Sequence, residues 1–231
     1  MTAHQTIPDD TWHARLRTLA ICLLLLLLAT DVVLISLHIL WFEDDWVWDI
    51  EADNGYGETF QYLKWSAAVL LLLILAWRRR AAIYAVWAAV FLYLLIDDSQ
   101  SLHEAMGERL VPLLRLRDVE EIYHRNFEYF FLRGEDFGEL IVALAVATAI
   151  ALALYLFWPD QAAQRERHVT KWLIGWVLLF AFFAVGVDML HIMAWEIYPP
   201  ALDVLTVIEE GGEMVCASLL VGWLALEAAC T

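Results

Sequence analysis

The chain has 231 residues, of which 62% are hydrophobic, and a mean hydropathy of +0.62. Soluble domains are about 45–50% apolar, so this composition excludes a soluble globular protein, a disordered chain and a disulfide-stapled secreted domain. Fourteen Lys and Arg residues against thirty Asp and Glu residues give a formal net charge of −16. This acidity excludes nucleic acid as a partner, because too few cations are present to neutralise a phosphate backbone.

Several apolar stretches reach about 20 residues, the length that a helix needs to cross a bilayer. We therefore predict an all-α, polytopic integral membrane protein, with residues 1–231 forming a single transmembrane domain built as a six-helix bundle. The predicted spans are residues 19–42, 61–77, 81–102, 137–158, 172–195 and 204–228. The first span is too long for a signal peptide, so we predict that it is retained.

The connection between the third and fourth spans, residues 105–136, alternates apolar and charged residues. Its apolar groups are Leu110, Val111, Leu113 and Leu114, followed by Phe127, Tyr129, Phe130 and Phe131. This pattern is typical of short amphipathic helices that lie on a membrane surface. We predict such helices in this connection.

Basic residues predict the orientation in the membrane, because cytoplasmic loops are enriched in Lys and Arg. Eight of them fall on one side of the predicted bundle: Arg15, Arg17, Arg78, Arg79, Arg80, Arg165, Arg167 and Lys171. The segment Phe42–Thr59 on the other side carries seven acids and no base. We therefore predict a protein of the plasma (inner) membrane with both termini cytoplasmic and residues 105–136 outside.

Ionisable residues within membrane spans are costly and indicate functional sites by default. Here they gather at particular span ends: Asp97 to Glu104 end the third span, Asp188 to His191 end the fifth, and Glu209 to Glu213 begin the sixth. Glu139 lies near the start of the fourth span. Because successive spans run in opposite directions, all four groups are predicted to lie at one level, in the outer third of the bilayer.

Helical periodicity also places these residues on common faces. Asp97, Ser101 and Glu104 are four and three positions apart, and Asp188 and His191 are three apart. So many carboxylates at one level repel one another unless a cation is bound or some are protonated. Carboxylates with imidazoles suit zinc, iron or manganese, so we expect one or two divalent ions. The predicted metal ligands are Asp97, His103, Glu104, Asp188, His191, Glu209 and Glu213.

These features favour a metal-dependent intramembrane enzyme, a hydrolase or an oxidoreductase, whose site faces the periplasm or exterior. A site at that depth suits a lipid or another hydrophobic small molecule as substrate, with membrane lipids as further partners. The metal would activate water or oxygen, and a carboxylate would carry protons. The predicted catalytic residues are Glu104 and Glu210 as carboxylates, with Ser101 as a nucleophile.

Two alternatives belong to other functional classes. In a cation- or proton-coupled transporter, the same acids would bind a cation transiently. In a haem-binding or structural subunit of a membrane complex, His38, His103 and His191 would supply axial ligands. A homo-oligomer and a larger membrane complex are both compatible with the sequence.

Overall fold

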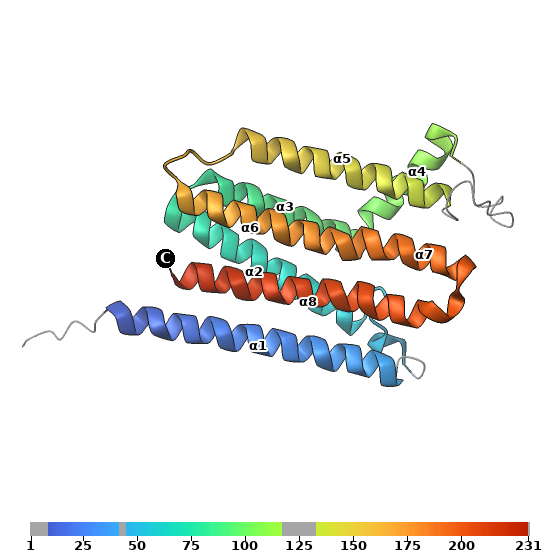
Figure 1. The fold of residues 1–231 in the computed structure, drawn as a ribbon, viewed down its shortest axis with the longest axis horizontal. Coiled ribbons are helices and arrows are strands. Elements are labelled where there is room, and N and C mark those ends of the chain that lie inside the picture. Colours follow the sequence, from blue (N-terminus) through green and yellow to red (C-terminus); the bar gives the residue numbers. More distant parts are fainter. Residues whose placement is uncertain (1–8, 42–44, 117–132, 231) are drawn as a thin grey trace, which may run out of the picture.

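Long helices lying side by side make up the computed structural model of the chain, which describes residues 9–41, 45–116 and 133–230 (Figure 1). The α-helices are α1 (Asp9–Trp41), α2 (Tyr56–Arg79), α3 (Ala82–Gln100), α4 (Leu102–Leu114), α5 (Gly134–Leu156), α6 (Gln164–Ala181), α7 (Asp188–Ile197) and α8 (Leu202–Ala229). Three short elements join them: η1 (Trp46–Trp48), the π-helical η4 (Phe182–Val187) and η5 (Pro199–Ala201). All regular structure in the described ranges is helical, which confirms the predicted all-α class.

Within the described residues, five helical stretches are long and apolar enough to cross a membrane. They are Thr11–Trp41, Tyr56–Arg79, Ala82–Gln100, Gly134–Leu156 and Gln164–Trp195, the last of which runs through α6, η4 and most of α7. These stretches overlap the first five predicted spans. Helix α8 coincides in position with the sixth predicted span but is not one of the five. Large apolar side chains of these five stretches, such as Leu25 in α1 and Leu144 in α5, are exposed, as lipid-facing residues are.

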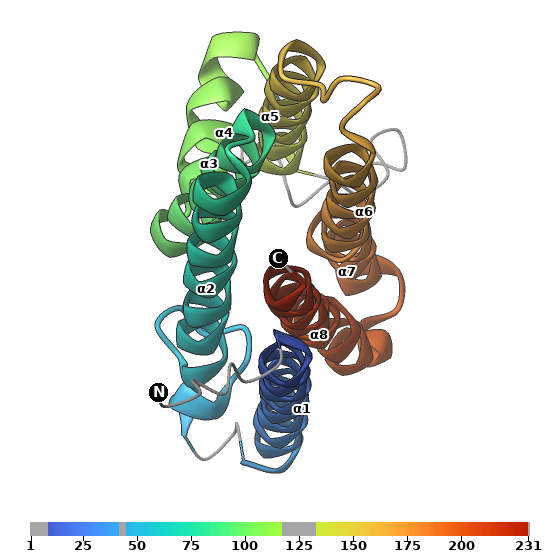
Figure 2. The ribbon, with the colours of Figure 1, turned by 90° about the vertical axis from the view of Figure 1, so that its left-hand side faces the viewer.

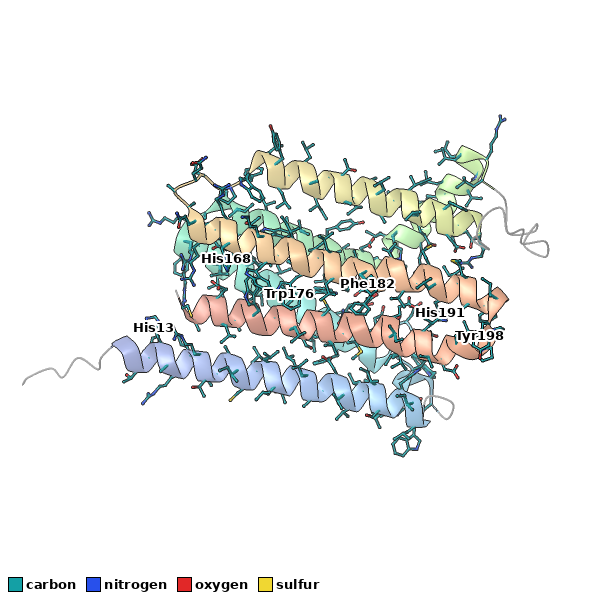
Figure 3. The ribbon with its side chains drawn as sticks, viewed as in Figure 1. His13, His168, Trp176, Phe182, His191 and Tyr198 are labelled. Carbon is teal, nitrogen blue, oxygen red and sulfur yellow. The ribbon has the colours of Figure 1, made fainter. Side chains whose placement is uncertain are left out.

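The two ends of the bundle differ in charge. The α2–α3 turn, the α5–α6 connection and the C terminus lie together at one end (Figure 1). We call it the basic end, after Arg78–Arg80 and Arg165; the Arg165 guanidinium lies 2.9 Å from the Glu227 carboxylate. The α3–α4 junction, the start of α5 and the α7–α8 connection lie at the opposite end, which we call the acidic end. His13 and His168 lie at the basic end, and His191 at the acidic end (Figure 3).

Helix α8 is the centre of the bundle and packs against α1, α2, α6 and α7 (Figure 2). Much of the buried core lies between α2, α3 and α8, where Trp65, Phe91 and Leu224 are almost fully buried. The Trp65 and Phe91 rings stack with their centroids 5.7 Å apart. This core holds together α2, α3 and α8, three of the helices that carry acids at the acidic end.

Helix α5 is placed differently, because its extensive contacts are with α4 rather than with the core. Glycines permit that crossing: a Cβ atom added to Gly138 would lie 2.4 Å from the Gly107 carbonyl oxygen. No side chain larger than hydrogen fits there, since real Cβ contacts are longer. Away from this crossing, α5 lies to one side of the bundle (Figure 2).

The third predicted span ends earlier than expected. Helix α3 stops at Gln100, and α4 begins at Leu102, so Asp97, Ser101 and Glu104 do not share one continuous helix. The break occurs at Ser101, whose φ of 44° is in the left-handed region and whose N–H donates to the Asp97 carbonyl. Helix α4 covers the first apolar group of the connection, and its position on a membrane surface stays a prediction. The second group, 127–131, lies outside the described residues.

Candidate functional site

A polar cavity of about 500 Å³, which we call the chamber, lies at the acidic end. Its wall is built by residues of the η1–α2 connection, of helices α2, α3, α4, α5, α6, α7 and α8, and of η4. Thirteen carboxylic acids of the described ranges line it: Glu51, Asp53, Glu58, Asp97, Asp98, Glu104, Glu108, Glu135, Glu139, Asp188, Glu209, Glu210 and Glu213. Among the residues that the structure describes, the basic ones in the same lining are Arg133 and His103. The predicted common level of the acids therefore corresponds to a shared cavity.

An apolar cavity of about 600 Å³, which we call the groove, runs between α3, α5 and α6. Residues at helical spacing along α5 form one wall, among them Val142, Val146, Ile150 and Leu154. Asp97, His103, Glu139 and Asp188 line both the groove and the chamber. The two cavities therefore meet at these four polar side chains.

The break at Ser101 brings His103 back towards the end of α3. The His103 Nδ1 atom lies 3.2 Å from Asp97 Oδ2, and the Tyr93 hydroxyl donates to the other Asp97 oxygen, also at 3.2 Å. The hydrogen bond with Asp97 raises the pKa of His103 above its ordinary value, although burial acts in the opposite direction. A continuous helix would place positions 97 and 103 on different faces, so this pair depends on the break.

Asp188 begins α7 directly after the π-helical segment η4. A π-helical turn contains more residues than an α-helical turn, so it changes which side chains face the bundle beyond it, and such segments are frequent at functional sites. Phe183 in this segment packs on α8, where a Cβ atom at Gly212 would lie 2.3 Å from its ring. Gly212 of α8 thus lets the segment approach closely, next to the chamber.

Helix α8 contributes three glutamates to the chamber, and one of them is paired. The His191 Nδ1 atom lies 2.9 Å from Glu209 Oε2, and both side chains are mostly buried. Gln61 of α2 is also buried in the lining; its Nε2 donates to the Glu213 carbonyl at 3.5 Å, while its Oε1 has no hydrogen-bond partner in the structure. A buried oxygen of this kind is suited to a donor or a cation brought by a ligand.

Arg133 precedes α5 and caps its first turn. Its Nε and Nη2 atoms lie 2.9 and 2.7 Å from Asp136 Oδ1, and Asp136 is fully buried. This bidentate contact fixes the first turn of α5. Asp136 lies three residues before Glu139, so the contact also helps to position Glu139. The same guanidinium also lies 3.6 Å from the Glu135 carboxylate through Nη1, so Arg133 is shared between Asp136 and one acid of the chamber.

A second polar cluster lies deeper in the bundle, among α1, α2 and α8. The Lys64 ammonium donates to Asp31 Oδ1 at 3.0 Å and to the Met214 carbonyl at 2.9 Å. Ser218 donates to the other Asp31 oxygen at 2.6 Å. This cluster adjoins the chamber along α8, because Met214 follows Glu213.

A family model described as a domain of unknown function (DUF8692) matches residues 18–230. The chain belongs to this family. The matched residues run from α1 to the end of α8 and include the whole described lining of the chamber and groove. No curated protein and no solved structure matches the chain.

The structure gathers most of the predicted site residues of this family member around the chamber. Asp97, Ser101, His103, Glu104, Asp188, Glu209, Glu210 and Glu213 all line it. His191 does not line the chamber and contacts it through Glu209. Within residues 9–41, 45–116 and 133–230, no three His, Cys, Asp or Glu side chains stand in a geometry that could hold a metal ion.

Sequence reasoning missed several polar residues of these two clusters. Asp98, Glu58 and Gln61 line the chamber but were not among the candidate residues. The predicted second span, residues 61–77, places Lys64 at a span end, and the structure corrects this: α2 begins at Tyr56, so Lys64 lies two turns inside the helix. The available signal was Glu58, because an acidic residue is favoured in the first turn of a helix.

Proposed function

We propose that this protein is a membrane-embedded enzyme that binds a divalent cation in the chamber and acts on a lipid or another hydrophobic molecule held in the groove. The observation that carries the proposal is the shared lining, since Asp97, His103, Glu139 and Asp188 face both cavities. Small-molecule sites in proteins combine a mostly apolar surface with a few convergent polar groups. The junction of chamber and groove has this composition.

The charge of the chamber supports a bound cation. Two carboxylates 4 Å apart repel by about 4 kcal/mol at the effective dielectric of a protein surface. Thirteen acids share this cavity with His103 and an Arg133 that Asp136 already binds. Oxygen and imidazole ligands suit zinc, iron or manganese. Binding requires side chains of α3, α4, α5 and α7 to turn towards one point in the chamber.

The proposed roles follow from position. Asp97, His103, Glu139 and Asp188 hold the cation beside the substrate, and Glu209 and Glu213 hold it, or a second ion, from α8. His191 orients Glu209. A divalent ion there supplies Lewis acidity towards water or a polar substrate bond. Glu104, 57% exposed at the chamber rim, exchanges protons with solvent, Glu210 transfers them within the chamber, and Ser101 is the candidate nucleophile.

We further propose that α8 is a sixth span in the plasma (inner) membrane and that both termini are cytoplasmic. Its 28 residues exceed the length needed to cross a bilayer, and it lies among the other spans. The basic end then faces the cytoplasm and the chamber faces outwards, as the distribution of Arg and Lys favours. In this arrangement the whole chain forms one transmembrane domain, alone or within an oligomer.

The buried Asp31–Lys64 pair favours a second candidate, a cation- or proton-coupled transporter. Charged residues inside membrane spans often mark ion pathways. The pair lies deeper than the chamber and is joined to it through the Lys64 contact with the Met214 carbonyl. A transporter of this kind would carry ions between chamber and pair without needing an organic substrate.

Elemental analysis of the detergent-purified protein tests the enzyme proposal. We expect near-stoichiometric zinc, iron or manganese in the wild type and a loss of most of it in Asp97→Asn and Asp188→Asn. Asp203→Asn is the matched control, because Asp203 is an exposed acid of α8 outside the chamber lining. A metal-free wild type, or equal metal in all three variants, would contradict the proposal. Metal-free protein that moves protons across vesicles would support the transporter.

A further inference from the structure

We infer that the substrate of this site is an amphiphile with a long hydrocarbon chain and an uncharged or cationic polar end, which reaches the site sideways from the bilayer. The inference rests on the proposed function and adds the class of the substrate and its route. In this arrangement the chain lies along α5 in the groove, and the polar end lies at Asp97 and Asp188.

The length of the groove suits a long chain. Its lining on α5 runs from Glu139 to Tyr155, which at 1.5 Å per residue is about 24 Å. One leaflet contributes about half of the 30 Å hydrocarbon core of a bilayer. The groove is therefore longer than one leaflet is thick, and its lining beyond the four shared polar residues is mainly apolar.

The groove is open towards the bilayer along α5. That helix is held mainly through its crossing with α4 at the acidic end, where Gly107 and Gly138 meet. Farther along, Ala147 and Ala151 line the groove and are nevertheless exposed. A hydrocarbon chain can thus enter between α5 and α6 while its polar end stays at the level of the chamber.

Charge decides which polar end fits. Thirteen carboxylic acids line the chamber in the part of the chain that the structure describes, and two divalent ions would offset only four negative charges. Arg133 cannot bind an anionic group freely, because its guanidinium is bound to Asp136. Cavities lined by one sign of charge attract the opposite sign and repel their own. An amine, a hydroxyl or an amide therefore fits better than a phosphate diester or a carboxylate.

Photolabelling in phosphatidylcholine vesicles tests this inference. The probe is a hexadecylamine that carries a diazirine at the far end of its chain, and labelled residues are mapped by mass spectrometry. We expect labels around Leu154 and Ile174, at the end of the groove remote from the chamber. Ala147→Phe should reduce this labelling about tenfold, because the larger side chain fills the groove. Ala149→Phe, an exposed position outside the lining, is the matched control and should label as the wild type does.

The remaining outcomes separate this inference from the proposed function. Equal labelling of Ala147→Phe and Ala149→Phe would overturn the inference, whatever the metal content. Stronger labelling by a diazirine-bearing hexadecyl sulfate than by the amine would overturn the assignment of the polar end. Groove labelling in a protein that contains no metal would support the amphiphile while contradicting the metal-dependent enzyme.

Discussion

The Lys64 ammonium lies 3.0 Å from the Asp31 carboxylate, and both side chains are almost completely buried. The two residues come from α2 and α1, and α8 completes the cluster through Ser218 and the Met214 carbonyl. An isolated charge at this depth would be strongly unfavourable, so each residue depends on the other. This pair ties three helices together next to the chamber.

Lys64→Met should destabilise the protein strongly, because it leaves Asp31 buried without its cation. Removing one partner of a buried pair costs about 3–5 kcal/mol, which corresponds to a fall of about 10 °C in melting midpoint for a chain of this size. Thermal unfolding in detergent measures this. Lys171→Met is the control, because Lys171 is exposed. The Asp31→Asn/Lys64→Met double variant should recover most of the lost stability. Equal melting midpoints for Lys64→Met and Lys171→Met would contradict this prediction.

Gly138→Ala should separate α5 from α4. The added methyl group would lie 2.4 Å from the Gly107 carbonyl oxygen, so the helices must move apart. Overpacking of this kind costs about 1–3 kcal/mol. Gly175→Ala offers a matched comparison, since a Cβ atom there meets no atom within 4 Å, and it should be neutral or slightly stabilising. Similar melting midpoints for the two variants would show that the crossing tolerates a side chain.

The His103–Asp97 contact should depend on pH. The pKa of His103 is raised above 6.5, so the contact stabilises the metal-free protein fully below that pH. Its contribution is lost as the pH rises through the raised pKa. The difference in melting midpoint between the wild type and His103→Gln should therefore be larger at pH 6 than at pH 9. His168→Gln, at a histidine that accepts a hydrogen bond from Trp172, is the control. A difference that grows with pH would contradict this.

The orientation can be tested with reporters fused after Thr231. If the C terminus is cytoplasmic, a fusion to green fluorescent protein should fluoresce. A fusion to alkaline phosphatase should be inactive, because this phosphatase folds only outside the cytoplasm. The physical basis is the gathering of arginines near the C-terminal end of α8, where Arg78 donates to the Ala228 carbonyl and Arg165 pairs with Glu227. An active phosphatase fusion would reverse the proposed orientation and place the chamber on the cytoplasmic side.

The common level of Asp97, Asp188 and Glu213 was predictable, because antiparallel spans bring their ends together and the apolar runs fix the spans. The contact between His103 and Asp97 was not, since nothing in the sequence around Ser101 indicates a left-handed residue. The Asp31–Lys64 pair was not predictable either, because it joins residues 33 positions apart through tertiary packing. The hydropathy pattern of the sequence thus predicts the level at which the acids lie. The contacts that each acid makes depend on helix breaks and on tertiary packing, which the sequence pattern does not indicate.

Zinc-edge anomalous diffraction from crystals grown with zinc tests the central claim, that the chamber holds a cation beside the groove, most directly. The account predicts an anomalous peak within about 2.2 Å of carboxylate oxygens of Asp97 or Asp188. The same crystals of Asp188→Asn should lose most of that peak, while Asp203→Asn should keep it. An absence of any peak in the chamber, with zinc found only at surface sites such as His168, would contradict the claim.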